Sequence, residues 1–115
     1  MSSHTATTDA APVLWVHTAR ARPAWYALTA AERAEHEGRF ARARESAVSA
    51  GATTDGVFDV RGQSDYSVME AWTFPDATAA FAHWATLVDA GYAQWFAFAN
   101  TLGTAHALAE RSGSA

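Results

Sequence analysis

Two residues in strand-like segments carry side chains that could move a proton. Alternation of polar and apolar residues near the N-terminus places His17 on the same strand face as Trp15. The same alternation further along the chain places Glu70 on one face with Trp72. An imidazole is a general base or acid near neutral pH, and desolvation raises the pKa of a carboxylate among apolar side chains unless a cation compensates. We therefore predict that His17 is a catalytic base and that Glu70 orients it or relays the proton.

A structural interpretation of the same two residues stays open. His17 would then line a cavity or a subunit interface, with its ring bound to backbone groups. Glu70 would form an ion pair with Arg61 or Arg22 at the edge of the sheet. In either case we expect the strand that carries His17 to lie beside the strand that carries Glu70.

Aromatic rings on these strands could hold a flat ligand. Trp15, Trp72 and Tyr66 suit stacking against an aromatic molecule in a mostly apolar pocket, although each ring could equally serve core packing. The polar candidates for substrate binding are His36, His83, Asn100 and Arg22.

Each polar candidate has a distinct expected role. His36 lies on the inner stripe of a predicted helix, from which it could project over the pocket entrance or bind haem iron axially. His83 is expected at a helix flank. Asn100 could donate a hydrogen bond to a ligand carbonyl, and Arg22 could guard the entrance and attract an anionic substrate. The alternatives are a boundary histidine with satisfied hydrogen bonds and a solvated arginine.

Several devices that hold cofactors are missing from the sequence. The chain has no cysteine, which excludes thiolate metal sites and a cysteine nucleophile. The histidines show no HExxH or His-x-His spacing, and no Gly-rich phosphate loop or serine nucleophile elbow occurs. We therefore expect a site without a metal and an enzyme that works without a cofactor.

Composition indicates one globular domain. Half of the 115 residues are apolar, the net charge is −4, and all eight basic residues are Arg, which makes nonspecific nucleic-acid binding unfavourable. No apolar run approaches the roughly 20 residues that span a bilayer, and the N-terminus lacks the pattern of a secretory signal. We therefore expect a cytoplasmic protein without membrane contact. The domain is predicted at 12–110, with disordered tails at 1–11 and 111–115.

Hydrophobic periodicity gives the order of the secondary structure. The predicted strands are 12–18, 55–61, 66–73 and 95–102, and the predicted helices are 30–49, 77–88 and a short turn at 104–110. A turn at 62–65 would make a hairpin of the second and third strands. Thr29 and Glu32 have the spacing of a capping box, and Asp76 is placed to cap the second helix. The order β-α-β-β-α-β is that of the ferredoxin-like α+β fold, with a four-stranded antiparallel sheet.

Both long helices should cover one face of this sheet. The inner stripe of the first helix is expected at His36, Phe40, Ala43 and Ala47, with Arg44 on its flank. The inner stripe of the second helix is expected at Ala77, Ala80, Phe81, Trp84 and Val88. The other sheet face would carry Trp15 and Trp72 without cover. A twofold homodimer with facing sheets would bury that patch and enclose a cavity on each sheet.

Two parts of the chain resemble known proteins. The segments VMEAW (68–72), FPDA (74–77) and FAH (81–83) resemble the third strand and second helix of antibiotic-biosynthesis-monooxygenase-like proteins, which belong to the dimeric α+β barrel superfamily. The segment PAWYALTAAER (23–33) is similar to an opening segment of the darcynin-like proteins in that superfamily, with Tyr26 in place of the usual Leu.

The resemblance spans roughly residues 13–103 and implies the fold and a homodimer. Its superfamily contains cofactor-free oxygenases, cyclases, isomerases, haem enzymes and ligand sensors. We hypothesise a small cofactor-independent enzyme that abstracts a proton from an aromatic or polyketide-like metabolite. The resemblance alone implies the subsequent cyclisation, isomerisation or oxygenation. Two alternatives stay open: a noncatalytic dimeric small-molecule-binding protein, and a haem-binding protein that uses His17, His36 or His83.

Overall fold

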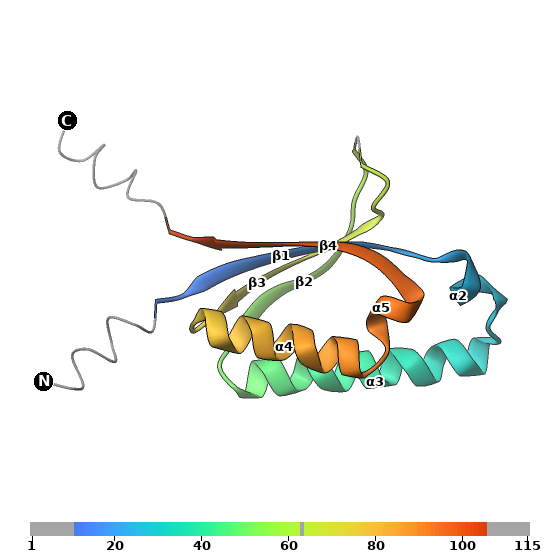
Figure 1. Cartoon of the computed structure of the whole chain (residues 1–115), viewed down its shortest axis with the longest axis horizontal. Coiled ribbons are helices and arrows are strands. Elements are labelled where there is room, and N and C mark those ends of the chain that lie inside the picture. Colours follow the sequence, from blue (N-terminus) through green and yellow to red (C-terminus); the bar gives the residue numbers. More distant parts are fainter. Residues whose placement is uncertain (1–10, 63, 106–115) are drawn as a thin grey trace, which may run out of the picture.

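A computed structural model of the chain describes residues 11–62 and 64–105. Its elements follow the order β1 (Val13–Ala21), α2 (Pro23–Ala27), α3 (Ala30–Ser49), β2 (Thr53–Asp59), β3 (Val68–Phe74), α4 (Ala77–Asp89), α5 (Tyr92–Trp95) and β4 (Phe96–Thr104). The four strands form one antiparallel sheet in the order β2-β3-β1-β4. Both long helices lie on the same face of the sheet (Figure 1). The predicted ferredoxin-like α+β fold is confirmed.

The caps of the long helices also agree with the sequence. Thr29 accepts a hydrogen bond from the Glu32 backbone, and the Glu32 side chain accepts one from the Thr29 backbone, which closes the predicted capping box. At the start of α4, the Asp76 carboxylate accepts from the backbone N–H of Ala79 at 2.8 Å. No helix in the part of the chain that the structure describes is long and apolar enough to cross a membrane.

Several boundaries differ from prediction because the strands pair along their full length. β1 runs three residues beyond the predicted 12–18, since its end pairs with the start of β4, from Val13↔Thr104 to Ala21↔Phe96. β2 begins and ends two residues early, so the connection to β3 is longer than the predicted turn at 62–65. The predicted helical turn at 104–110 begins with a β4 residue, and most of it lies outside the described residues, as do nearly all residues of the predicted tails.

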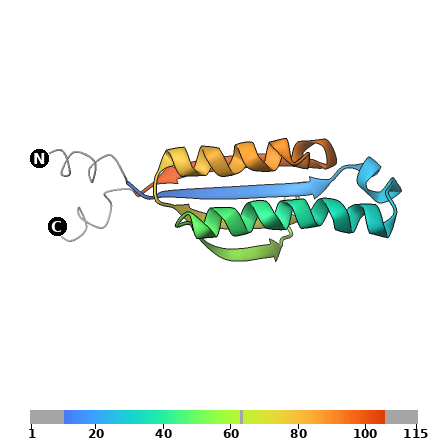
Figure 2. The ribbon, with the colours of Figure 1, turned by 90° about the horizontal axis from the view of Figure 1, so that it is seen from below.

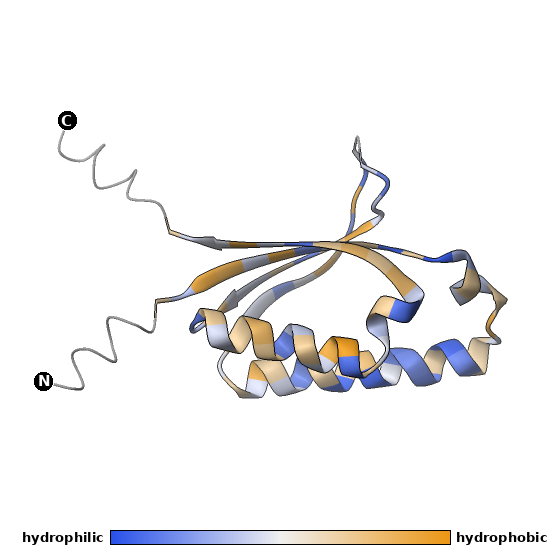
Figure 3. Cartoon of the chain, viewed as in Figure 1, coloured by the Kyte–Doolittle hydropathy of each residue, from blue (hydrophilic) through white to orange (hydrophobic). Residues whose placement is uncertain are grey.

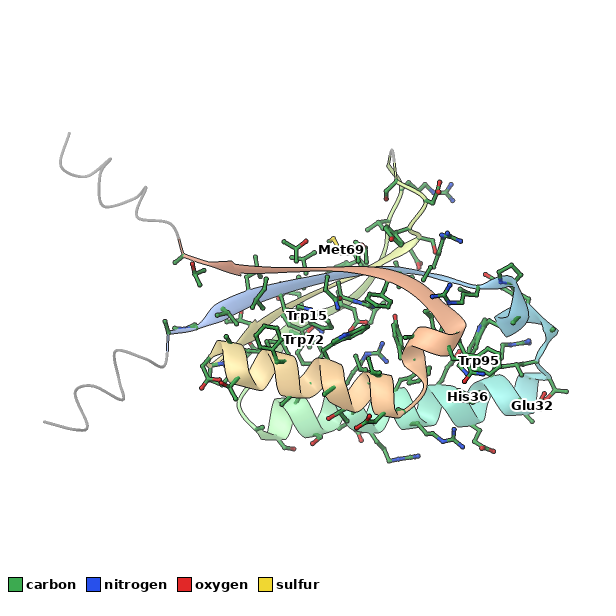
Figure 4. The ribbon with its side chains drawn as sticks, viewed as in Figure 1. Trp15, Glu32, His36, Met69, Trp72 and Trp95 are labelled. Atoms are coloured by element: carbon green, nitrogen blue, oxygen red, sulfur yellow. The ribbon has the colours of Figure 1, made fainter. Side chains whose placement is uncertain are left out.

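The predicted exposure of Trp15 and Trp72 is wrong. Both indoles lie between the sheet and the helices, with only 3% and 2% of their surface exposed (Figure 4). The open face carries smaller or flexible side chains, such as those of Val16, Met69 and Ala71. Large aromatic rings bury more apolar area than these residues, so the helix-covered face is the energetically favoured place for them. The predicted cavity on the open sheet face therefore loses its proposed aromatic walls.

The inner face of α4 also differs from prediction. Its buried residues are Ala80, His83 and Leu87, whereas Phe81 and Val88 are 64% and 42% exposed. Apolar residues make up most of this helix, whose ribbon is predominantly orange and pale in Figure 3. Periodicity therefore leaves the rotation of α4 ambiguous. The consequence is that His83 lies in the core and not at the flank.

Candidate functional site

Glu70 lies in the middle of β3, and its buried carboxylate is occupied by three hydrogen bonds. Arg44, from the C-terminal half of α3, donates from Nε to Oε1 at 3.0 Å and from Nη2 to Oε2 at 2.9 Å. The indole Nε1 of Trp72 donates to Oε1 at 3.1 Å. A bidentate arginine with a further donor is the kind of arrangement that compensates a buried carboxylate.

The ion pair keeps both groups charged. Burial opposes the ionised form of Glu70, but the hydrogen bonds and charge of Arg44 outweigh burial and hold the pKa of Glu70 below its ordinary value. Burial likewise opposes charge on Arg44, and the carboxylate outweighs it, so the pKa of Arg44 is raised. The partner of Glu70 is thus neither Arg61 nor Arg22. Because its pKa is held low and its oxygens are already hydrogen-bonded, Glu70 is a weak proton acceptor, and its effect on neighbouring groups is electrostatic.

His17 is fully buried in β1, with hydrogen bonds at both ring nitrogens. Nδ1 lies 2.6 Å from Oδ1 of Asn100, and Nε2 lies 2.8 Å from the hydroxyl of Tyr92. An amide oxygen only accepts, so Nδ1 carries the proton and Nε2 accepts the Tyr92 O–H. Burial lowers the pKa of His17, against the opposing effects of the Asn100 hydrogen bond and the Glu70 charge. His17 is therefore a neutral imidazole near pH 7.

Tyr92 is positioned by the turn between α4 and α5. Gly91 adopts φ 94°, a left-handed conformation that favours glycine, and the chain reverses there so that Tyr92 enters the core. The Tyr92 ring stacks on that of Phe96, with 4.8 Å between the ring centroids, and packs edge to face with Phe40, with 5.1 Å between the centroids. Burial raises the pKa of Tyr92, so its hydroxyl stays protonated and donates to His17.

His17 and Glu70 are directly opposite each other in the register of β1 and β3. The predicted adjacency of these strands is therefore confirmed. Among the described residues the two side chains make no direct hydrogen bond, because other partners occupy their polar atoms. The Glu70 charge still favours a proton on His17. Its effect is electrostatic, while Asn100 and Tyr92 orient the ring.

An open groove runs between α3 and the neighbouring strands β2 and β3, and we call it the α3–β2 groove. Figure 2 shows β2 lying beyond α3, where neither long helix covers it. Two adjoining hollows of about 400 and 520 Å³ make up the groove and share Arg44, Val57 and Glu70. Apolar walls come from Phe40, Val48, Val68, Trp72 and Phe96, and Tyr92 lines the larger hollow. These volumes fall in the range of small-molecule sites.

Local geometry gives the groove its polar groups. The register of β2 shifts between Thr54 and Val57, where Gly56 adopts φ 103°, and this irregularity brings Val57 opposite Glu70. Arg44 binds Glu70 through Nε and Nη2, so Nη1 points away from the carboxylate. The groove thus has apolar walls and one guanidinium edge, and it borders Tyr92, whose hydroxyl is hydrogen-bonded to His17.

The predicted site residues divide into two groups. Glu70 and Trp72 line the α3–β2 groove, and His17 and Asn100 connect to it through Tyr92. The others lie elsewhere. Tyr66 donates to the Phe98 carbonyl, and Arg22 donates to the Ala93 carbonyl. His36 packs near Trp95 toward the N-terminal end of α3 (Figure 4). Trp15 packs against His83 of α4.

Sequence reasoning missed two residues of the site. Arg44 was expected on the flank of the α3 stripe, and only the folded structure places it beside the Glu70 carboxylate. Tyr92 falls in a segment that reads as a helix break, and only the turn at Gly91 directs it inward. A tyrosine next to a left-handed glycine gives no periodic signal.

Two of the three histidines that were considered for haem, His17 and His83, are poorly placed to bind it. Both nitrogens of His17 are occupied by protein partners. His83 is enclosed by Trp15, Trp72 and Phe74 and borders a cavity of only about 130 Å³, below the usual size of a small-molecule site. Within residues 11–62 and 64–105, no three His, Asp or Glu side chains gather in a group that could hold a metal ion.

Comparison with known proteins gives structural matches only. No family model and no curated protein sequence matches the chain. A mutant chlorite dismutase from Candidatus Nitrospira defluvii superimposes with a TM-score of 0.67 at 13% identity over 90% of this chain. A second chlorite dismutase-like protein superimposes with a TM-score of 0.64 at 18% identity over 82% of this chain. The chain spans less than half of those two proteins, 47% and 43% of their lengths.

A third structure is that of SnoaB, a cofactor-independent oxygenase from Streptomyces nogalater. It matches with a TM-score of 0.49 at 20% identity, over 84% of this chain and 95% of its own. The matches to the chlorite dismutases show that the chain shares their ferredoxin-like fold. At these identities the likeness concerns the fold and not the chemistry.

Proposed function

We propose that the chain is a small cofactor-independent enzyme that transfers a proton from an aromatic or polyketide-like metabolite bound in the α3–β2 groove. The observation that carries this proposal is the chain of hydrogen bonds from Tyr92 in the groove to Nε2 of His17, with Nδ1 fixed by Asn100. A neutral base that is reached through a phenol from an apolar groove suits abstraction of a proton near neutral pH.

The proposed step moves two protons. The substrate proton passes to the Tyr92 oxygen as the Tyr92 hydroxyl proton passes to Nε2 of His17. The resulting imidazolium keeps its Nδ1–H bond to Asn100 and is favoured by the nearby Glu70 charge. Nη1 of Arg44 would stabilise the oxygen of the enolate that forms. Return of the proton to another carbon, ring closure or reaction with oxygen would then give an isomer, a cyclised product or an oxygenated product.

Exchange of a carbon-bound proton tests this function without knowledge of the natural substrate. The probe is benzoylacetone, an aromatic diketone, incubated in D₂O with the protein while its central CH₂ signal is followed by NMR. We expect the wild-type protein to accelerate exchange, and Tyr92→Phe to lose about 10²-fold or more of that acceleration. Tyr26→Phe is the matched control, because Tyr26 is 71% exposed. Equal exchange by both variants would contradict the proposal.

A noncatalytic ligand-binding protein is the second candidate, and the full hydrogen bonding of the Glu70 carboxylate favours it. Every oxygen of that carboxylate has a partner, which is how a group that only shapes a pocket would be held. Binding of benzoylacetone by wild type, observed as quenched tryptophan fluorescence, without any acceleration of exchange would support this candidate. Binding retained in Tyr92→Phe with exchange lost would support the enzyme.

We also propose that the chain forms a homodimer through the open sheet face. Leu14 and Phe58 are 48% and 44% exposed on that face, beside Val16, Met69 and Ala71. Such a surface is more apolar than a solvent-exposed sheet usually needs to be. We expect light scattering to give twice the chain mass for wild type and the monomer mass for Val16→Arg. A monomeric wild type at micromolar concentration would overturn this assignment.

A further inference from the structure

His83 is buried and takes no part in the network around His17. Only 4% of its surface is exposed, and within the described part of the chain neither ring nitrogen has a hydrogen-bond partner. Buried polar atoms almost always have a partner in native proteins. Because the α3–β2 groove makes no use of His83, its two unpaired nitrogens call for a separate explanation.

The aromatic rings around His83 provide no hydrogen-bond partner for its nitrogens. Its ring centroid lies 5.0 Å from that of Trp72, 5.3 Å from that of Trp15 and 5.6 Å from that of Phe74. These rings hold the imidazole in place, and the indole Nε1 of Trp72 is already bound to Glu70. A partner for His83 must therefore come from the side that the rings leave open.

His83 is one of the residues that line a cavity between α3 and α4, which we call the interhelix cavity. It measures about 130 Å³, and its walls are largely alanine methyl groups, including those of Ala47 and Ala82. Ser46 and Thr86 add hydroxyl groups, and no charged side chain lines it. Water occupies roughly 30 Å³ per molecule in the liquid, so the space suits a few waters or an organic molecule with a handful of heavy atoms.

We propose that the interhelix cavity binds a small uncharged molecule with a hydroxyl group, such as a short alcohol, and that His83 is its hydrogen-bond partner. The neutral ring offers one donor and one acceptor, which match a hydroxyl group. The alanine walls match a short hydrocarbon, and the lack of a charged wall disfavours an ionic ligand. This site goes beyond the proposed function and does not depend on the α3–β2 groove.

The test is a titration with 2-propanol, followed by the ¹⁵N resonances of the histidine rings. We expect a saturable shift of one His83 nitrogen and no shift of the His17 nitrogens, which are held by protein partners. Ala82→Leu narrows the cavity without touching the imidazole, and it should weaken binding at least tenfold, as should His83→Phe. Ala85→Leu is the matched control, because Ala85 is equally exposed on the same helix but does not line the cavity, and it should leave binding unchanged.

Three outcomes would overturn the proposal. One is that the His83 nitrogens do not respond to 2-propanol at any concentration that leaves the protein folded, which would make the cavity a hydration site or an empty space. Another is equal affinity in Ala82→Leu and Ala85→Leu. The third is that His83→Phe binds as tightly as wild type. If His83→Phe does not fold, the two leucine variants still decide the matter, because they leave the ring intact.

Discussion

His17 and His83 pack against the same indole ring and have opposite surroundings. His17 stacks on Trp15 with 5.1 Å between centroids, and His83 meets that ring edge-on at 5.3 Å. Both are buried, and burial lowers both pKa values. His17 has a partner at each nitrogen, whereas within the described residues His83 has none. The two histidines are therefore alike in burial and differ in whether their ring nitrogens have hydrogen-bond partners.

The comparison indicates that polar chemistry is concentrated on one side of the core. Arg44, Glu70, Trp72, Tyr92 and Asn100 connect the α3–β2 groove to His17 through short hydrogen bonds and charge. Under α4, by contrast, the contacts of His83 are aromatic and apolar. Changes on the His17 side should therefore cost stability and chemistry together, while His83 should be tolerant at neutral pH and sensitive only to acid.

The largest effect is expected from removal of the buried cation. Arg44→Met leaves the Glu70 carboxylate buried without its main partner, and we expect a loss of about 3–5 kcal/mol in the free energy of unfolding. The matched control is Arg42→Met, an exposed position on the same helix, which should change it by about 0.5 kcal/mol or less. Urea unfolding measures both. Equal losses in the two variants would mean that the ion pair does not organise the site.

The second effect concerns acid. Burial lowers the pKa of His83 from 6.5 to about 4, so the unfolded chain binds a proton at higher pH than the folded chain does. The stability associated with neutral His83 is complete above pH 6.5 and is lost as the pH falls toward 4. The loss amounts to about 3 kcal/mol at 1.36 kcal/mol per pKa unit. Relative to wild type, His83→Phe should gain that amount between pH 7 and 4, and parallel stability curves would contradict the assignment.

A third prediction compares the two histidines at pH 7. His17→Phe leaves the Tyr92 hydroxyl without its acceptor in the core, and we expect a loss of about 1–3 kcal/mol from that group. His83→Phe removes two unpaired nitrogens and keeps an aromatic ring, so we expect a change of less than about 1 kcal/mol. Thermal unfolding at pH 7 measures both variants. A larger loss for His83→Phe than for His17→Phe would reverse the comparison.

The smallest effect is a change in proton affinity at His17. The Asn100 hydrogen bond raises the pKa of His17 against the larger effect of burial. Asn100→Leu should therefore lower that pKa further, whereas Asn100→Asp should raise it by placing a carboxylate beside Nδ1–H. Side-chain NMR over a pH series follows both. The pKa of His17 should shift in opposite directions in the two variants. Shifts in the same direction would show that Asn100 does not set the charge on His17.

Sequence patterns were sufficient for the fold and for the pairing of His17 with Glu70. Period-two alternation identified which residues share a strand face, and the β-α-β-β-α-β order placed β1 beside β3. Alternation does not show which face of the sheet the helices cover. The helices cover the face that carries Trp15 and Trp72, so both side chains lie in the core. The size of the rings could have decided it, because the largest apolar side chains gain the most from full burial.

The site itself depends on features without a periodic signal. The α4 helix carries large apolar residues on more than one side, so its rotation, and with it the burial of His83, could not be read from spacing. Tyr92 enters the core because of the left-handed turn at Gly91. Arg44 reaches Glu70 from a helix flank, across 26 positions of sequence. Each is a tertiary contact that local sequence does not encode.

The proposed proton transfer requires that Nε2 of His17 accept the hydrogen bond of the Tyr92 hydroxyl, and the ¹⁵N spectrum of the His17 ring reports this state. At pH 7 we expect a neutral ring with the proton on Nδ1 and a hydrogen-bonded, unprotonated Nε2 whose resonance moves in Tyr92→Phe. A proton on Nε2 would make the Tyr92 oxygen the acceptor, and a doubly protonated ring would leave no base. Either result would contradict the proposed proton transfer.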